Sequence, residues 1–170
     1  PDDNKEEGFG VHGFGRIALV RALVKFERWV EILEPGVIPW PEGKRGQAQR
    51  KRAELLAHLA QGDVKRAEAL RREIESDMRS NERDMPEGFE PPAGMPGPSE
   101  RMEGALEELD GRIHLAKGEL LEGHAKLASA AERQFEHFMD DPPHDAQFLY
   151  TTLGEHHLEP QNVVAHGAIA

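Results

Sequence analysis

Apolar residues dominate the segment 16–34, and its few basic positions follow a helical period. Arg21, Lys25 and Arg28 recur at intervals of four and three residues, so they fall on one narrow stripe of a helix. Nearly all the remaining positions are apolar. The pattern predicts a helix over 16–34 that is buried over most of its girth and that ends at the following Pro-Gly pair.

Two amphipathic segments follow, 46–60 and 63–83, with a Gly-Asp pair at their junction. Glycine is a favourable C-terminal stop for a helix and aspartate is a favourable N-cap, so we expect a helical pair over 46–83 rather than one continuous helix. The stretch resembles the helix–Gly-Asp–helix hairpins of tetratricopeptide and UVR-type interaction modules. No second copy follows at a spacing of about 34 residues, so a tetratricopeptide array is not expected.

A heptad pattern begins at Met102. Apolar residues recur there at alternating intervals of four and three, which is the spacing of a coiled-coil seam. The positions are Met102, Leu106, Leu109, Ile113, Ala116 and Leu120, followed less regularly by His124, Leu127, Ala131, Gln134 or Phe135, and Phe138. This pattern predicts one long helix over 99–141, with Ser99 as its N-cap.

The remaining segments lack a helical period. Residues 1–15 are acidic and then rich in glycine, and they predict a pliable N-terminal arm. Residues 85–98 hold many Pro and Gly residues and predict a linker. Residues 142–170 predict an extended C-terminal arm. The expected fold is therefore all-α: an elongated helical bundle, a coiled-coil-like antiparallel hairpin with extended N- and C-terminal arms, whose first helical segment spans 16–84.

Charge is unevenly distributed along the chain, whose net charge is −11. Residues 44–83 carry 11 basic and 7 acidic side chains, whereas residues 99–141 carry 5 basic and 11 acidic ones. Segments of opposite sign are suited to packing on each other, and we expect them to do so in antiparallel fashion. The negative total disfavours general nucleic-acid binding.

Composition adds two exclusions. The chain has no cysteine, which rules out disulfides, thiolate metal sites and cysteine nucleophiles. It has no run of 18 apolar residues, so no transmembrane segment is expected. The expected location is the cytoplasm or a virion, or the interior of an organelle if a transit peptide has been removed.

Gly8–Gly13 spells G-x-G-x-x-G, the letters of a dinucleotide-binding loop. That loop requires a buried strand before the glycines, and the preceding residues are charged and too few to form one. No serine occupies a nucleophile elbow either. We therefore expect no cofactor, no small-molecule substrate and no catalytic residue, so the protein is not expected to be an enzyme.

Nine histidines raise the alternative of a metal-dependent enzyme that uses those near the C-terminus. His137 and Asp141 stand four residues apart, but Asp141 precedes a proline and is therefore biased out of a helix. The sequence contains no H-E-x-x-H motif on a helix. We expect surface histidines rather than a metal site.

The run 44–52 packs five basic residues into nine positions at the expected start of a helix. The helix dipole disfavours positive charge there, which favours an acidic protein partner, while nucleic acid, phosphate and a solvated surface stay open as alternatives. The residues expected to bind partners are the aromatic anchors and three of these bases: Phe9, Phe14, Trp29, Trp40, Arg50, Lys51, Arg52, Phe148 and Tyr150.

The sequence thus predicts a non-catalytic structural or scaffold subunit. It would make protein–protein contacts within a larger homo- or hetero-oligomeric assembly, as a virion connector, a minor capsid component or an accessory subunit of an enzyme complex. One alternative is a regulatory binding module that uses the run 44–52 for nucleic acid or phosphate. The other is the metal-dependent enzyme.

Overall fold

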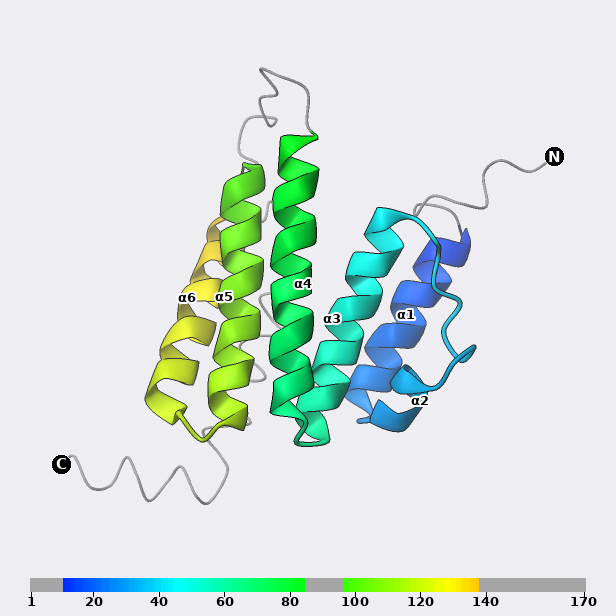
Figure 1. The fold of residues 1–170 in the computed structure, drawn as a ribbon, viewed down its shortest axis with the longest axis horizontal. Helices are drawn as coiled ribbons and strands as arrows, with labels where there is room; N and C mark the ends of the chain where they lie inside the picture. The colour runs from blue at the N-terminus through cyan, green and yellow to red at the C-terminus, as the bar shows by residue number, and fades with distance from the viewer. Residues whose placement is uncertain (1–10, 85–96, 138–170) are drawn as a thin grey trace. The chain divides into compact units, whose positions relative to one another are not determined.

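The computed structural model describes residues 11–84 and 97–137, and within these ranges the protein is all-α (Figure 1). Six helices form, and the described residues contain no strand. The chain divides into two compact units, 1–81 and 82–170, and each is described by itself below. The all-α prediction is therefore confirmed for the described residues.

The predicted helix over 16–34 is wrong, because this segment forms two helices. Helix α1 spans Val11–Lys25 and α2 spans Trp29–Leu33, so α1 also takes in part of the predicted N-terminal arm. Between them Glu27 adopts a left-handed conformation with φ of 54°. The Arg28 N–H then donates to the Leu23 carbonyl at 2.8 Å, which closes the end of α1.

The predicted helical pair is confirmed, with α3 over Lys44–Ala60 and α4 over Val64–Arg83. Gly62 has φ of 78°, the left-handed conformation that favours glycine. Asp63 caps α4, because its Oδ1 accepts the Arg66 backbone N–H at 3.1 Å. Both residues therefore act as the sequence predicted.

The core of the first unit lies where α2, α3 and the loop after α2 meet. Its fully buried members are Ile32, Ile38, Ala53 and Ala57. Leu55, Ala67, Leu70 and Ile74 on α3 and α4 are also buried. The start of α3 lies tight against Pro41, because a Cβ on Gly46 would stand 2.0 Å from the Pro41 Cγ. Only glycine fits at that position.

The predicted long helix over 99–141 is also wrong. Helix α5 spans Pro98–Ala116, α6 spans Leu120–His137, and the three residues between them form a turn with Gly118 at φ of 80°. The N-cap is Gly97 rather than Ser99, and Glu100 Oε2 accepts the Gly97 N–H at 2.9 Å. The heptad stripe therefore belongs to two helices rather than to one continuous seam.

Helices α5 and α6 fold back on each other as an antiparallel hairpin (Figure 1). Their backbones meet closely at Gly111 and Gly123. A Cβ on Gly111 would lie 2.9 Å from Leu127 Cγ, and a Cβ on Gly123 would lie 2.7 Å from Leu115 Cδ2. Buried side chains of both helices form one cluster at this contact: Leu115, Leu127, Ala130 and Ala131.

A six-residue sequence recurs at the turns of the two hairpins, and the sequence analysis missed it. His58–Asp63 reads H-L-A-Q-G-D, and His114–Glu119 reads H-L-A-K-G-E. The hydrogen bonds match as well. In the first turn Asp63 N–H donates to the His58 carbonyl at 2.8 Å, and in the second Glu119 N–H donates to the His114 carbonyl at 2.9 Å. Both are Schellman turns with glycine at the left-handed position.

Helix α5 contains a buried acidic side chain. The Glu108 side chain is fully buried, and its Oε1 accepts a hydrogen bond from Arg112 Nε at 3.1 Å. A buried carboxylate requires such compensation, because desolvation penalises the charged form.

Candidate protein-interaction surface

The outer face of α1, of α2 and of the turn between them exposes large apolar side chains. Leu19, Phe26 and Val30 are 36%, 70% and 68% exposed. The opposite side of the same helices contacts the core through partly buried residues: Val20, Leu23, Val24 and Leu33. The prediction that this segment is buried over most of its girth is therefore wrong within the described residues, because these contacts cover only one side of α1.

Positive charge borders this apolar face. Helix α1 contains Arg16, Arg21 and Lys25 and no acidic residue. At the start of α2, Arg28 donates a hydrogen bond to Glu31. That bond lowers the pKa of Glu31 and raises the pKa of Arg28. The ion pair between Arg28 and Glu31 thus balances the charge at the start of α2. Helix α1 itself remains basic.

Both tryptophans of the predicted binding set contribute to the packing of the first unit. Trp29 and Trp40 are partly buried and pack against the cluster of Ile32, Ile38, Ala53 and Ala57. Contact of either ring with a partner stays a prediction.

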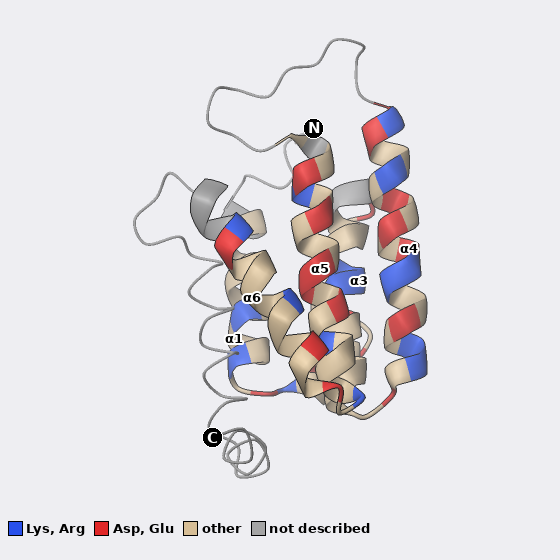
Figure 2. Cartoon of the chain, turned by 90° about the vertical axis from the view of Figure 1, so that its left-hand side faces the viewer, with Lys and Arg blue, Asp and Glu red and all other residues tan. Residues whose placement is uncertain are grey.

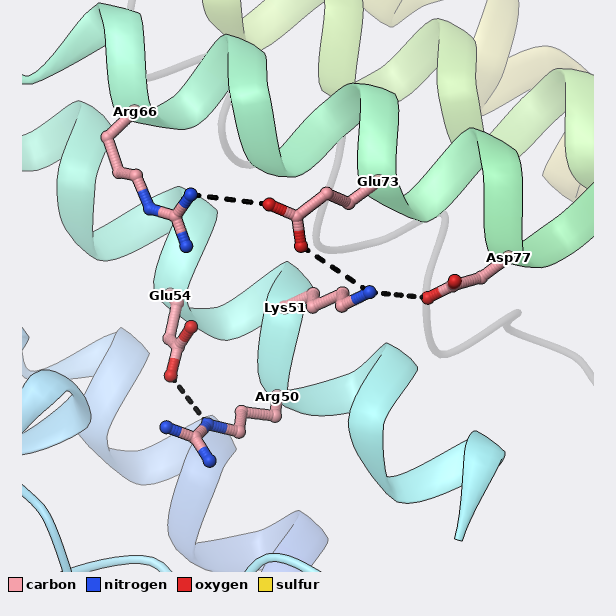
Figure 3. Close-up of polar contacts among 6 residues, drawn as sticks. All are labelled: Arg50, Lys51, Glu54, Arg66, Glu73 and Asp77. Atoms are coloured by element: carbon pink, nitrogen blue, oxygen red, sulfur yellow. Dashed lines mark hydrogen bonds and ion pairs between the residues drawn. The ribbon is translucent and has the colours of Figure 1, made fainter. Parts of the chain in front are cut away.

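Helices α3 and α4 are joined by an ion-pair network around Lys51 (Figure 3). Lys51 Nζ lies 2.7 Å from Asp77 Oδ2 and 3.5 Å from Glu73 Oε2, and Arg66 Nη1 lies 3.3 Å from Glu73 Oε1. The hydrogen bond with Asp77 is the largest cause that raises the pKa of Lys51. These contacts fix Lys51 in its charged form between the two helices.

The acidic neighbours of Arg50 and Lys51 thus lie within their own unit. Arg50 Nε contacts Glu54 Oε1 at 2.6 Å one turn along α3, and Lys51 contacts α4. Arg52 also has an interaction partner. The three bases are therefore engaged within the chain, and a role for them in binding another molecule stays a prediction.

Acidic and basic residues also alternate along α4 (Figure 2). Glu75 contacts Arg71 and Arg79, the latter through Nη2 at 2.6 Å. Hydrogen bonding from Arg79, with the nearby charge of Arg71, lowers the pKa of Glu75. The charges of α4 are thus largely balanced along the helix itself.

Three of the predicted binding residues, Phe9, Phe148 and Tyr150, lie outside the described residues. Phe14 lies in α1, and its side chain is not among those described. The C-terminal histidines after His137 are outside as well. In the two described ranges, no three His, Asp or Glu side chains cluster as metal ligands would. None of the described helices is long and apolar enough to cross a membrane.

Comparison with protein-family models, with curated proteins and with solved structures gives no significant match.

Proposed function

We propose that the protein is a non-catalytic structural subunit that makes protein–protein contacts within a larger assembly. The observation that supports this function best is the exposed apolar face of Leu19, Phe26 and Val30. Exposed large apolar side chains with charged residues beside them are typical of interaction surfaces. A virion component and an accessory subunit of an enzyme complex both fit this description.

The proposal includes the elongated form with extended terminal arms that the sequence favours. An elongated subunit with arms can reach several neighbours, which suits a connector. Small-angle scattering of the purified protein measures this shape, and a compact particle would remove this part of the proposal.

The alternative of a regulatory module that binds nucleic acid or phosphate is less favoured. Such a module would need the bases of 44–52 to face the ligand, whereas Arg50 and Lys51 contact carboxylates of their own unit. Binding would have to break those contacts before it gained new ones.

The size of the native species in an extract of the source cells tests the proposed function. We expect a complex well above the 19.0 kDa of the single chain. The double variant F26D/V30D should shift it to smaller size, because two charges then lie in the apolar face. Ser76→Asp is the matched control, since Ser76 is exposed on α4 and far along the chain from this face. A monomeric wild-type protein in the extract would overturn the proposal.

A further inference from the structure

The outer face of α1 combines large and small apolar residues. Leu19 on α1 and Phe26 just after it are exposed, and the small residues Ala18 and Ala22 of α1 are exposed as well. Small residues between large ones let another helix approach closely. The face therefore has the form of a shallow docking surface for a helix.

The charges beside this face determine which partner it accepts. Arg21 and Lys25 are exposed and α1 has no acidic residue, so an acidic surface complements α1 itself, while Glu27 and Glu34 are exposed in the turn and after α2. A second α1 would bring cations against cations. An isologous contact between two α1 helices is therefore disfavoured.

The start of α6 has the complementary chemistry. The described residues expose four large apolar side chains, and the fourth is Leu121, which is 75% exposed. Glu119 and Glu122 flank it and are exposed, and Ala125 is exposed one turn further along. This surface thus presents an apolar side chain and a small residue with an acidic border.

We propose that the outer face of α1 and α2 in one copy docks on the start of α6 in a second copy. The inference rests on the proposed function and names the partner as the chain itself. Because the two contacting surfaces differ, the contact is heterologous: each of the two copies keeps one free surface, so the pair has one free surface of each kind. Repetition of this contact produces an open chain of subunits or a closed ring.

An anionic membrane is the other surface that a basic apolar helix could meet. The net charge of −11 opposes approach to anionic lipid. A protein partner with a local acidic surface is therefore favoured over a lipid surface.

Complementary variants test the inference on the purified full chain by light scattering over a range of concentrations. Wild-type protein should form species larger than a dimer as concentration rises. Phe26→Asp removes one surface and Leu121→Asp removes the other, so each variant alone should associate at least about tenfold more weakly. An equimolar mixture of the two retains one intact surface of each kind and should form a 1:1 dimer and nothing larger.

Controls separate this contact from its alternatives. Ser76→Asp adds the same charge on exposed α4 and should assemble like wild type, and helical circular dichroism should be unchanged in all variants. A monomeric wild type at every concentration overturns the inference, as does full dimerisation of Leu121→Asp or binding of the wild type to anionic phosphatidylserine vesicles without self-association. If the purified chain is monomeric while the native species stays large, the inference fails and the proposed function stands.

Discussion

The two hairpins share a turn but differ in how closely their helices approach. Leu55 stands seven residues before the turn glycine of the first hairpin, and Gly111 stands seven before that of the second. Five residues after the glycine the positions are Ala67 and Gly123. Leu55 and Ala67 of the first hairpin are buried residues with side chains, whereas the two glycines of the second let the backbones of α5 and α6 come close together. One turn sequence therefore supports two kinds of helix contact.

Ion pairs between the helices occupy matching positions in both hairpins with opposite polarity. In the first, Lys51 on α3 contacts Asp77 on α4 at 2.7 Å. Counted from the turns, the equivalent residues of the second are Glu107 and Arg133, whose Oε2 and Nε lie 3.2 Å apart. If helices of the two hairpins exchanged partners, like charges would meet at these positions. Because the two ion pairs have their charges in opposite order, they favour pairing of each helix with its own partner during folding.

Of the substitutions considered, Gly111→Leu, which places the leucine of the first hairpin at the matching position of the second, should lower the stability most. Even a Cβ on Gly111 would lie 3.0 Å from the Gly123 carbonyl oxygen, so Gly111→Leu should force the helices apart. We expect a loss of about 3 kcal/mol or more in the free energy of unfolding, beyond the usual cost of overpacking. Urea unfolding followed by circular dichroism measures it.

Gly104 supplies the matched control for this substitution, because it is buried in the same helix. Its nearest neighbour for a Cβ is the flexible Arg133 side chain at 4.0 Å. Gly104→Ala should be neutral or stabilising by up to about 1 kcal/mol, the helix-propensity gain. A Gly111→Leu variant as stable as wild type would mean that the close crossing is not required.

Charge reversal should break one ion pair and leave the other intact. Glu107→Lys places a cation beside Arg133, and we expect a loss of about 1 kcal/mol, within the range of partly exposed pairs. The double variant E107K/R133E restores opposite charges and should recover most of the loss. A double-mutant cycle by urea unfolding gives the coupling energy. A double variant no better than the single ones would contradict the proposed ion pair.

High pH should weaken the first hairpin through the same contact. The pKa of Lys51 is raised in the folded protein, so its contribution to stability is complete below the unfolded pKa of about 10.4. It is lost as the pH rises through the higher folded pKa. The stability difference between wild type and Lys51→Met should therefore shrink above about pH 10.5. An unchanged difference at high pH would show that Lys51 acts through packing alone.

The helices were largely predictable from the apolar pattern, but their ends required backbone conformations that the pattern does not report. The break at Gly62 was found because an N-capping aspartate follows it. The equivalent break at Gly118 was missed, since Ala116 and Leu120 are four residues apart and preserve the heptad count across the reversal. A periodic pattern depends only on the intervals between apolar residues, so it does not show where the chain reverses direction.

The interaction surface was only partly predictable for a similar reason. The sequence correctly indicates that α1 is apolar on most sides, which implies a need for burial. It does not show how much neighbouring surface the chain itself provides. Leu19 and Phe26 remain exposed because the core contacts of α1 cover one side only. For Lys51 the sequence indicates an acidic neighbour, and only the hairpin geometry identifies Asp77.

Substitution of the residue after each turn glycine should change stability less than the substitutions above, and by different amounts in the two hairpins. Asp63 accepts the Arg66 backbone N–H, so Asp63→Ala should cost about 1 kcal/mol, the usual value of an N-cap. The Glu119 side chain instead contacts His114. Glu119→Ala should therefore cost less than half as much. Thermal unfolding of both variants makes the comparison, and equal losses would show that the two turns are capped alike.

The turn between α1 and α2 extends the comparison to a third Schellman-type helix end and carries the smallest expected effect. Its hydrogen bonds match the other two, but Glu27 occupies the left-handed position where they have glycine. A side chain there costs roughly 1 kcal/mol, so Glu27→Gly should stabilise the protein by about 0.5–1 kcal/mol despite the added freedom of the unfolded chain. Glu27→Ala keeps a Cβ, loses only the exposed carboxylate, and should give no such gain. If both variants are equally stable, the left-handed conformation of Glu27 does not reduce the stability of the protein.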